Sequence, residues 1–521
     1  MKNYYFLVIG LILTALFLNI GIQPLFLEEP RRAIVAMEMM EAGNLWVPLQ
    51  LGEYYYFKPP IYNWLIILSV TLFQTWEEWA VRIPSVLSFI SLAVLIYAVG
   101  KRHHSRQMGL FSALFFMVSI DILFYFSLLA EIDLFYSLIT FGVLSALLHF
   151  SNTQQYGWMY LTAYLLSAVG FLTKGMPSIA FLGLGILYTC YYHQQWKKLF
   201  HPMHFVSGFL FLGIVGGYFL YYSQFHDPIA FLEGIWTQSS QRTVVEHSWT
   251  RFLAHILVFP IDLFKNTLPA SLILLFYFQK SSRKIIQNHP FLRYSLGMLA
   301  VQLILYWLSP GAKQRYIYML YPLVIYLASG IYINIKKSHQ WLNYLSTVLT
   351  MLLLVGGIGL YAFGKNYLTF PLVWPALLSV IFGLSLAVLL RQKIWPPVVV
   401  SVLALSALRI VFDLVVLPQR ATDSIAQSDK DRAAAIVEQV KAQPLFLYIE
   451  GDVPIIEEKE LPISLTMVFY LNKWRGTTLK SKRQWESGVY YLANKKVVPD
   501  GIDTQFEHQY GKETIVLVQY P

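Results

Sequence analysis

Residues 28–40 read EEPRRAIVAMEMM and residues 54–60 read YYYFKPP, and both segments lie between two strongly apolar stretches. They place acids, arginines and a lysine in the first loop beyond an apolar segment. Charged groups next to a bilayer are costly unless they are paired or used in function. The two segments therefore predict a functional site in this loop.

The composition is that of an integral membrane protein. Of the 521 residues, 56% are hydrophobic and only 13% are charged, which is too little polar material to cover a soluble globule of this size. The formal net charge of +10 could indicate nucleic acid, but the basic residues form short clusters between apolar runs. Such clusters are a topology signal of membrane proteins, so we expect no nucleic-acid partner. The single cysteine, Cys190, excludes an intramolecular disulfide.

The apolar stretches predict an all-α polytopic protein with about thirteen transmembrane helices, because a spanning helix needs about 20 mostly apolar residues. The first stretch lacks a small-residue cleavage pattern, and we expect it to remain as an uncleaved span. The expected spans are 4–21, 82–100, 109–129, 133–150, 157–173, 176–192, 204–222, 253–278, 294–309, 316–335, 343–363, 370–390 and 397–417.

The stretch 61–76 decides the orientation. If it only enters the interface, the basic clusters share the side of Lys2, which is then cytoplasmic. We therefore expect a juxtamembrane helix that begins after Pro59-Pro60. The clusters are Lys101/Arg102/Arg106, Lys197/Lys198, Lys280/Arg283/Lys284/Arg293, Lys336/Lys337 and Arg391/Lys393.

The tail changes character and predicts a second domain. We expect a transmembrane domain over residues 1–418 and a small α/β domain over residues 419–521, on the outer side of the membrane. Its expected elements are an amphipathic helix at 429–442, a strand at 444–450, a helix at 464–473, and strands around GVYYLA and TIVLVQY.

Ionisable residues from distant loops gather at the outer face of this topology. Each alone has a simpler explanation, such as a helix-end lysine that reaches the interface or a basic residue that touches lipid headgroups. Their convergence favours a site, above all for Glu28, Lys58 and Asp133. The residues are Glu28, Glu29, Arg31, Arg32, Lys58, Glu131, Asp133, Lys174, Arg242, His247, Lys313 and Arg315.

Several different short motifs occur along roughly the first 335 residues. They are EEPR at 28–31, AMEMM at 36–40, GN at 43–44, YYFKPP at 55–60, AVRIPS at 80–85, EID at 131–133, LTKG at 172–175 and KQRY at 313–316. In order and spacing they resemble the bacterial lipid A aminoarabinose transferases and the protein O-mannosyltransferases. The last spans and the tail match that family only in architecture.

The resemblance implies a GT-C type fold and an inverting transfer of a sugar from an undecaprenyl-phosphate carrier to a lipid, glycan or protein acceptor at the outer face of the inner membrane. A carboxylate must accept the proton of the acceptor hydroxyl, and cations must bind the carrier phosphate. By this resemblance the catalytic residues are Glu28 and Asp133, the phosphate ligands are Arg31, Lys58, Lys313 and Arg315, and further substrate contacts come from Glu29, Tyr55 and Lys174.

Two positions depart from the family pattern. The leading acid is usually aspartate and here is Glu28, whose carboxylate reaches one methylene further. The family glutamate implicated in metal binding is replaced by Phe57, and a phenyl ring cannot ligate a metal. His247 is then the remaining candidate ligand, and a divalent metal is not expected to be required.

Two other interpretations stay open from the sequence. A flippase or transporter for polyprenyl-linked substrates would also bind phosphate with basic residues, although such proteins tend to carry inverted repeats and polar groups near mid-membrane. A polysaccharide ligase would use a lipid-linked glycan as donor. Two charged pairs inside apolar stretches, Arg409 with Asp413 and Asp262 with Lys265, are expected to be structural.

Overall fold

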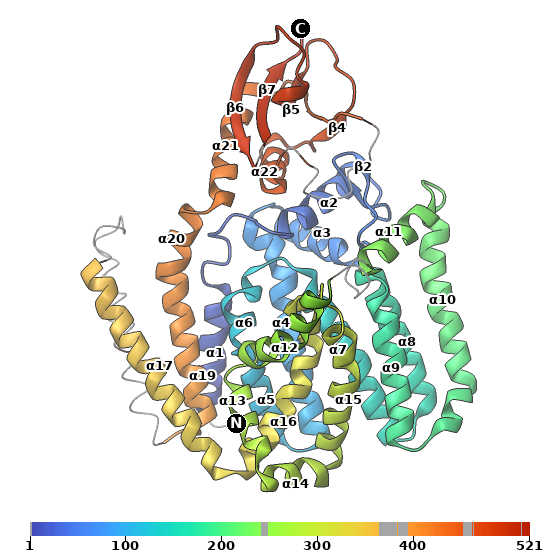
Figure 1. Cartoon of the computed structure of the whole chain (residues 1–521), viewed down its shortest axis with the longest axis vertical. Coiled ribbons are helices and arrows are strands. Elements are labelled where there is room, and N and C mark those ends of the chain that lie inside the picture. The colour runs from blue at the N-terminus through green and yellow to red at the C-terminus, as the bar shows by residue number, and fades with distance from the viewer. Residues whose placement is uncertain are drawn as a thin grey trace.

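The computed structural model describes residues 3–240, 248–363, 383, 394–451, 461, 463–511 and 513–521. The protein is mostly helical. Figure 1 shows long helices side by side in one body, a C-terminal sheet at one end of it, and α2 and α3 between the two. The loop of residues 22–81, which we expect to face outward and name the first outer loop, therefore lies between the helical body and the C-terminal sheet.

The helical body is built from apolar helices that pack around a continuous core. Its long helices are α1 (Asn3–Phe17), α4 (Glu78–His103), α5 (Arg106–Met117), α7 (Ile132–Asn152), α8 (Tyr156–Lys174), α9 (Pro177–Tyr192), α10 (Pro202–Tyr222), α15 (Pro290–Trp307), α16 (Tyr321–Asn334), α17 (Lys336–Phe363) and α19 (Pro397–Val411). Further helices connect them: α2 (Glu29–Glu41), α3 (Ile61–Phe73), α6 (Ile120–Phe124), α11 (Pro228–Ser240), α12 (Trp249–Asn266), α13 (Ala270–Leu274), α14 (Lys280–Asn288) and α20 (Leu417–Thr422).

Several helices can span a membrane. Among the described residues five are long and apolar enough, and up to seven if each of two bent helix pairs counts as one span. α3 has 13 residues and is about 20 Å long, which is shorter than the hydrocarbon core of a bilayer. The expected span 370–390 falls almost wholly outside the described residues.

The expected span 253–278 consists of two helices with a sharp bend between them. α12 and the helical turns over Ala270–Phe278 meet at 114°. Pro269 lies at the break between them. Because proline has no backbone N–H to continue the helical hydrogen bonds, the apolar stretch divides there into two helices. Sequence hydropathy reports the apolar length of a segment and not its direction.

Both charged pairs that were expected to be structural are confirmed. Arg409 Nε lies 2.7 Å from Asp413 Oδ1, and both side chains are fully buried. Lys265 Nζ lies 2.8 Å from Asp262 Oδ1. In each case residues three or four apart on one helix face neutralise each other locally.

The C-terminal residues form a mixed five-stranded sheet with strand order β4-β3-β5-β7-β6. β3 pairs in parallel with β4 and β5, and β7 pairs antiparallel with β5 and β6. The helices α21 and α22 pack on it in a hydrophobic cluster that continues into α2 and α3. The elements are α21 (Ile425–Val440), β3 (Leu445–Tyr448), α22 (Leu465–Arg475), β4 (Lys480–Lys482), β5 (Tyr490–Asn494), β6 (Thr504–Tyr510) and β7 (Glu513–Gln519).

A short hairpin of the first outer loop completes the fold. β1 (Leu49–Gln50) and β2 (Glu53–Tyr54) pair antiparallel. The N–H of Ser481 in β4 donates to the carbonyl of Leu51 in this hairpin over 2.8 Å. The hairpin is thus held against the edge of the C-terminal sheet.

Candidate active site

Glu28 lies at the start of α2, as the sequence predicts. It occupies the N-cap position, and Pro30 lies in the first turn, where its missing N–H costs no helical hydrogen bond. The Glu28 carboxylate accepts from Arg31 Nη1 over 3.0 Å and lies 3.7 Å from Arg32 Nη2. Burial raises the pKa of Glu28, but the charges of Arg31 and Arg32 outweigh it and hold the pKa below its usual range. Glu28 is therefore ionised at neutral pH.

A second pair of carboxylates flanks the start of α7. Arg315 Nη1 lies 2.8 Å from Glu131 Oε1, and Arg315 Nε lies 3.5 Å from Asp133 Oδ2. Lys174, at the end of α8, donates to Asp133. The Lys174 ammonium also lies 4.4 Å from the ring centroid of Tyr316. Arg315, Asp133 and Lys174 come from three separate segments and form one connected network.

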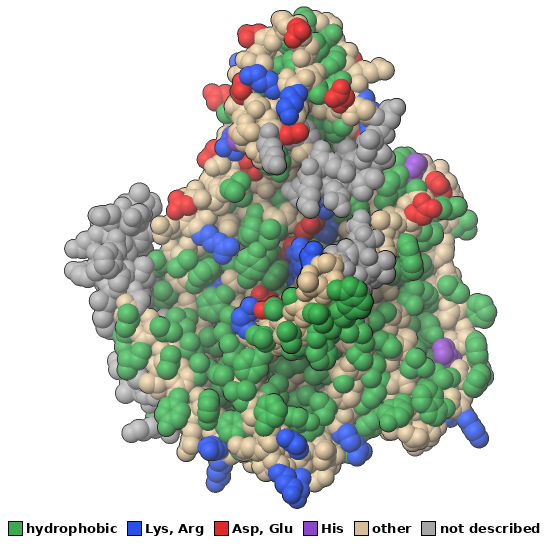
Figure 2. Space-filling model, in the orientation of Figure 1, with side chains coloured by type: hydrophobic (Ala, Val, Ile, Leu, Met, Phe, Trp, Pro, Cys, Tyr) green, Lys and Arg blue, Asp and Glu red, His purple; other side chains and the backbone are tan. Residues whose placement is uncertain are grey.

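A cavity of about 360 Å³ joins Glu28 to this network. The Glu28 side chain is 29% exposed, whereas those of Glu131 and Asp133 are 2% exposed. Lys313 is exposed on the same wall as Arg315. The same cavity therefore contains an ionised carboxylate and two cations. It is lined by Leu27, Glu28, Asp121, Tyr125, Phe126, Lys313, Gln314 and Arg315. Figure 2 shows acidic and basic side chains gathered in a recess between the apolar body and the C-terminal sheet.

Asp121 is a cavity residue that the sequence reasoning missed. It lies in α6 and accepts a hydrogen bond of 2.5 Å from the hydroxyl of Tyr318. The available signal was an acid inside an apolar stretch, which is expensive in a membrane and marks function by default.

Lys58 and Arg31 lie near Glu28 but do not line the 360 Å³ cavity. Lys58 donates to Gln238 of α11, and its charge is among those that lower the pKa of Glu28. The Arg31 guanidinium lies 5.9 Å from the centroid of the Phe57 ring. Both cations therefore surround the carboxylate from the side of the first outer loop.

Glu29 and Tyr55 accept hydrogen bonds from arginines next to the site. The Glu29 carboxylate is fully buried and accepts from Arg82 Nε over 2.8 Å, from Arg82 Nη2 over 2.9 Å and from the Ala130 N–H over 2.6 Å. The Tyr55 hydroxyl accepts from Arg32 over 2.9 Å. Neither residue lines the cavity. Arg82 was seen in the sequence only as part of a motif, because its partner lies 53 residues away.

The described residues do not fit a metal site. His247 lies within 241–247, outside the described residues. Phe57, at the position where the resemblance implies a glutamate, packs edge-on against Tyr55 with ring centroids 5.4 Å apart. Over the described ranges no group of three or more His, Cys, Asp or Glu side chains could hold a metal ion. No chemical step proposed below therefore runs through a metal, and the expectation that no divalent metal is required stays a prediction.

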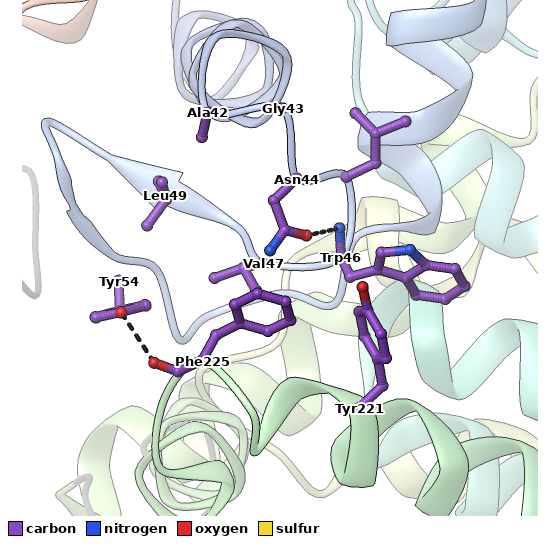
Figure 3. Close-up of a pocket in the computed structure, with 10 residues that line it drawn as sticks. Ala42, Gly43, Asn44, Trp46, Val47, Leu49, Tyr54, Tyr221 and Phe225 are labelled. Carbon is purple, nitrogen blue, oxygen red and sulfur yellow. Dashed lines mark hydrogen bonds between the residues drawn. The ribbon is translucent and has the colours of Figure 1, made fainter.

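A second cavity, of about 600 Å³, lies between the loop after α2 and the end of α10. Figure 3 shows Trp46, Tyr54, Tyr221 and Phe225 around it. The Tyr54 hydroxyl donates to the carbonyl of Phe225 over 3.1 Å and so joins the two walls. None of the predicted site residues that the structure describes lines this aromatic cavity.

Known proteins resemble this chain in sequence over part of its length. Residues 57–219 match the model of the dolichyl-phosphate-mannose-protein mannosyltransferase family. An uncharacterised protein of Aquifex aeolicus is 28% identical over 330 residues, which are 60% of this chain and 74% of that protein. The undecaprenyl phosphate-alpha-4-amino-4-deoxy-L-arabinose arabinosyl transferase 2 of Sodalis glossinidius is 28% identical over 180 residues, or 33% of this chain and 32% of its own length.

A solved structure extends the likeness to the whole chain. The crystal structure of ArnT from Cupriavidus metallidurans bound to undecaprenyl phosphate superimposes with a TM-score of 0.70 at 16% identity, covering 99% of this chain and 98% of that one. The chain therefore has the fold of ArnT, including the C-terminal sheet. The resemblance expected from the motifs is confirmed, although the sequence match spans only about a third of the arabinosyl transferases.

Proposed function

We propose that this chain, a polytopic membrane protein with the fold of ArnT and sequence kinship to the undecaprenyl-phosphate arabinosyl transferases, is an inner-membrane glycosyltransferase. It moves a sugar from an undecaprenyl-phosphate carrier to a lipid, glycan or protein acceptor, with inversion at the sugar. The observation that carries the proposal is the cavity that ionised Glu28, Lys313 and Arg315 line together.

The chemistry follows from the charges of this cavity. The acceptor oxygen attacks the anomeric carbon while Glu28 accepts its proton, and the bond from that carbon to the phosphate oxygen breaks on the opposite face. The carrier phosphate gains negative charge in this step. Lys313 and Arg315 stabilise that charge, since hydrogen bonds between ionised groups are the strong ones. Asp133 and Glu131 hold the Arg315 guanidinium in place.

The finer topology belongs to the same proposal. We propose about thirteen spans, a cytoplasmic N-terminus, and a periplasmic site with the C-terminal sheet on the same side as a small α/β domain. Support comes from the distribution of charge. Figure 2 shows lysine and arginine side chains along the end of the molecule opposite the C-terminal sheet, where α14 lies in Figure 1. The positive-inside rule makes that end cytoplasmic.

The test uses membranes that contain the overexpressed protein and radiolabelled undecaprenyl-phosphate sugars. We expect label to leave the carrier, and we expect Glu28→Gln to slow this loss at least about 100-fold, as removal of a catalytic base does. Glu233→Gln is the matched control, because Glu233 is an exposed acid on α11. Wild-type rates for both Glu28→Gln and Asp133→Asn would overturn the assignment.

The same assay separates the alternatives. A flippase would change the membrane side of the label while the label stayed on its carrier. A polysaccharide ligase would act only when the donor is a lipid-linked glycan. Single sugars that leave the carrier and appear on a membrane lipid or a protein support the proposal.

A further inference from the structure

The segment that leads into Glu28 is held by the C-terminal part of the chain. Leu25 is fully buried, and both of its backbone polar groups bond to side chains of α22. Its N–H donates to the Tyr470 hydroxyl over 3.2 Å, and its carbonyl accepts from Thr466 Oγ1 over 3.1 Å. Residues 466 and 470 are one helical turn apart and therefore share a face of α22.

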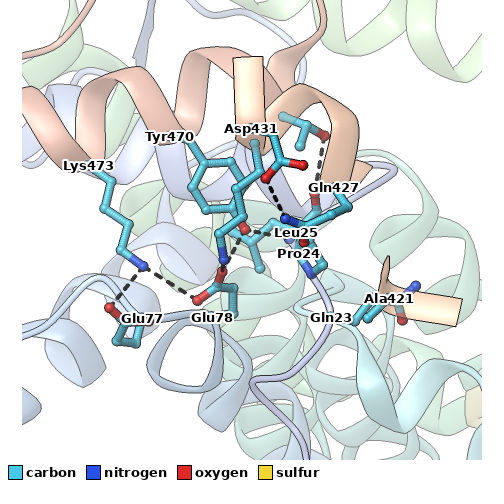
Figure 4. Close-up of polar contacts among 12 residues, drawn as sticks. Gln23, Pro24, Leu25, Glu77, Glu78, Ala421, Gln427, Asp431, Tyr470 and Lys473 are labelled. Atoms are coloured by element: carbon cyan, nitrogen blue, oxygen red, sulfur yellow. Dashed lines mark hydrogen bonds and ion pairs between the residues drawn. The ribbon is translucent and has the colours of Figure 1, made fainter. Parts of the chain in front are cut away.

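The Tyr470 hydroxyl is itself fixed by a carboxylate of the helical body. It donates to Glu78 Oε1 over 2.6 Å, and Glu78 also pairs with Lys430 over 2.8 Å and with Lys473 over 3.4 Å. Figure 4 shows Tyr470 pointing from α22 toward Glu78 and Leu25. A hydrogen bond to an ionised group is stronger than a neutral one. The hydroxyl that accepts from Leu25 is thus held in one position.

The backbone between Leu25 and Glu28 needs such support. Leu27 has φ +57°, in the left-handed region. A non-glycine residue there costs about 1–2 kcal/mol and persists only when its surroundings enforce it. The fixed points lie on either side of Leu27. Leu25 is held by α22, and Glu29 is held by Arg82.

A second contact holds the segment that leads to Lys58. Arg483 Nη2 lies 2.6 Å from Glu53 Oε1, and Ser481 Oγ donates to Glu53 over 3.2 Å. Glu53 is in β2, five residues before Lys58. The C-terminal part thus contacts both stretches of the first outer loop that lead into the site.

We propose that Tyr470 and Thr466 are positioning residues, which hold the Leu25 backbone and thereby orient the Glu28 carboxylate over the cavity. The catalytic consequence rests on the proposed function, whereas the two hydrogen bonds that hold the Leu25 backbone do not. The C-terminal part then helps to position the catalytic carboxylate, although none of its residues lines the cavity.

Hydrogen exchange, measured by mass spectrometry on the purified full-length protein, tests whether α22 holds the Leu25 backbone, and it needs no substrate. Tyr470→Phe keeps the ring and removes only the hydroxyl. Tyr491→Phe is the matched control, because the Tyr491 hydroxyl also accepts from a backbone N–H over 2.9 Å, that of Glu486 in the loop between β4 and β5. We expect about tenfold faster exchange in the peptide that contains Leu25 for Tyr470→Phe alone. Equal exchange of that peptide in the two variants would overturn the proposal.

Kinetics of sugar transfer test the consequence. For Tyr470→Phe we expect kcat to fall about tenfold with the KM for the carrier-linked sugar unchanged, because Lys313 and Arg315 lie on another segment. Thr466→Val should act in the same direction, and Tyr491→Phe should keep wild-type kinetics. Faster exchange with unchanged kcat would refute the positioning role. If the wild type transfers no sugar, the proposed function fails. The exchange result still shows whether α22 holds the Leu25 backbone.

Discussion

Two clusters of buried charge lie next to each other at the start of α2. They differ in how many of their hydrogen-bonding groups have a partner within the protein. In the closed cluster, Arg82 makes five hydrogen bonds, two to Glu29 and three to the carbonyls of residues 20, 23 and 24. In the open cluster, Glu28 and Arg315 keep exposed surface in a cavity. Two adjacent acids, Glu28 and Glu29, thus serve opposite purposes. A buried charge with all its bonds satisfied supports the fold, whereas one that faces a cavity is available to a ligand.

The closed cluster should dominate stability. Arg82→Met leaves the Glu29 carboxylate buried without its cation, and removal of one partner of a buried ion pair costs about 3–5 kcal/mol. We expect a large fall in the thermal midpoint of the purified protein in detergent, measured by intrinsic fluorescence. The double variant Arg82→Met/Glu29→Met should recover part of the loss, because no unpaired charge remains. A midpoint for Arg82→Met within one degree of wild type would refute the structural role.

The open cluster should dominate activity. Asp133→Asn is expected to lower sugar transfer by at least about 100-fold, because Arg315 loses one of its two carboxylate partners. Its effect on stability should be smaller than that of Arg82→Met, since Lys174 also lies over the rings of Tyr136 and Tyr316. Radiolabel transfer and thermal unfolding of the same preparation give both values. A variant that loses stability and activity in proportion would mean that the two clusters do not differ in kind.

Sequence reasoning reached the elements of the fold more readily than their directions. The apolar stretches correspond to helices wherever the structure describes them, and the predicted strand at 444–450 and helix at 464–473 are present as β3 and α22. Local periodicity determines such elements. The turn at Pro269 and the strand β6 were missed. The residues of β6 mostly alternate between exposed and half-buried side chains, and the strand contains no long apolar run.

The site was predicted as a set of residues but not as a set of partners. The i,i+4 pair Arg409 with Asp413 could be predicted because both residues share one helix. Lys174 with Asp133 and Arg315 with Glu131 are 41 and 184 residues apart, so only the tertiary fold brings them together. For the same reason the sequence could not show that Glu29 pairs with Arg82.

Lys313 offers a finer test of the open cluster. It is exposed on the cavity wall, and over the described residues it has no ion pair. Lys313→Met should weaken the binding of undecaprenyl phosphate about tenfold, since a hydrogen bond to a charged group contributes about 1.5–3 kcal/mol. Lys495→Met is the control, because Lys495 pairs with Glu507 in the C-terminal sheet. Binding can be followed by titration of the lipid in detergent. Equal losses in both variants would indicate a general charge effect.

Glu38 sharpens the comparison with a buried carboxyl that belongs to neither cluster. It accepts from the N–H groups of Leu51 and Gly52, and over the described residues it has no ion pair. Burial raises the pKa of Glu38 from 4.5 to about 8, and these backbone hydrogen bonds offset only part of the shift. Because the folded protein favours the protonated form, the stability from Glu38 is present below pH 4.5 and is lost as the pH rises toward 8.

Glu38→Gln should remove this dependence on pH. The variant should gain stability relative to wild type by up to about 1.4 kcal/mol for each pH unit between 5 and 8, because Gln does not titrate. Thermal midpoints measured across that range check the slope, and Glu233→Gln on α11 should follow wild type. If Glu38→Gln instead loses stability as the pH rises, Glu38 is ionised and stabilised in the fold. Hydrogen bonds from backbone N–H groups alone would then suffice to hold a buried carboxylate, and the closed cluster would not need its arginine.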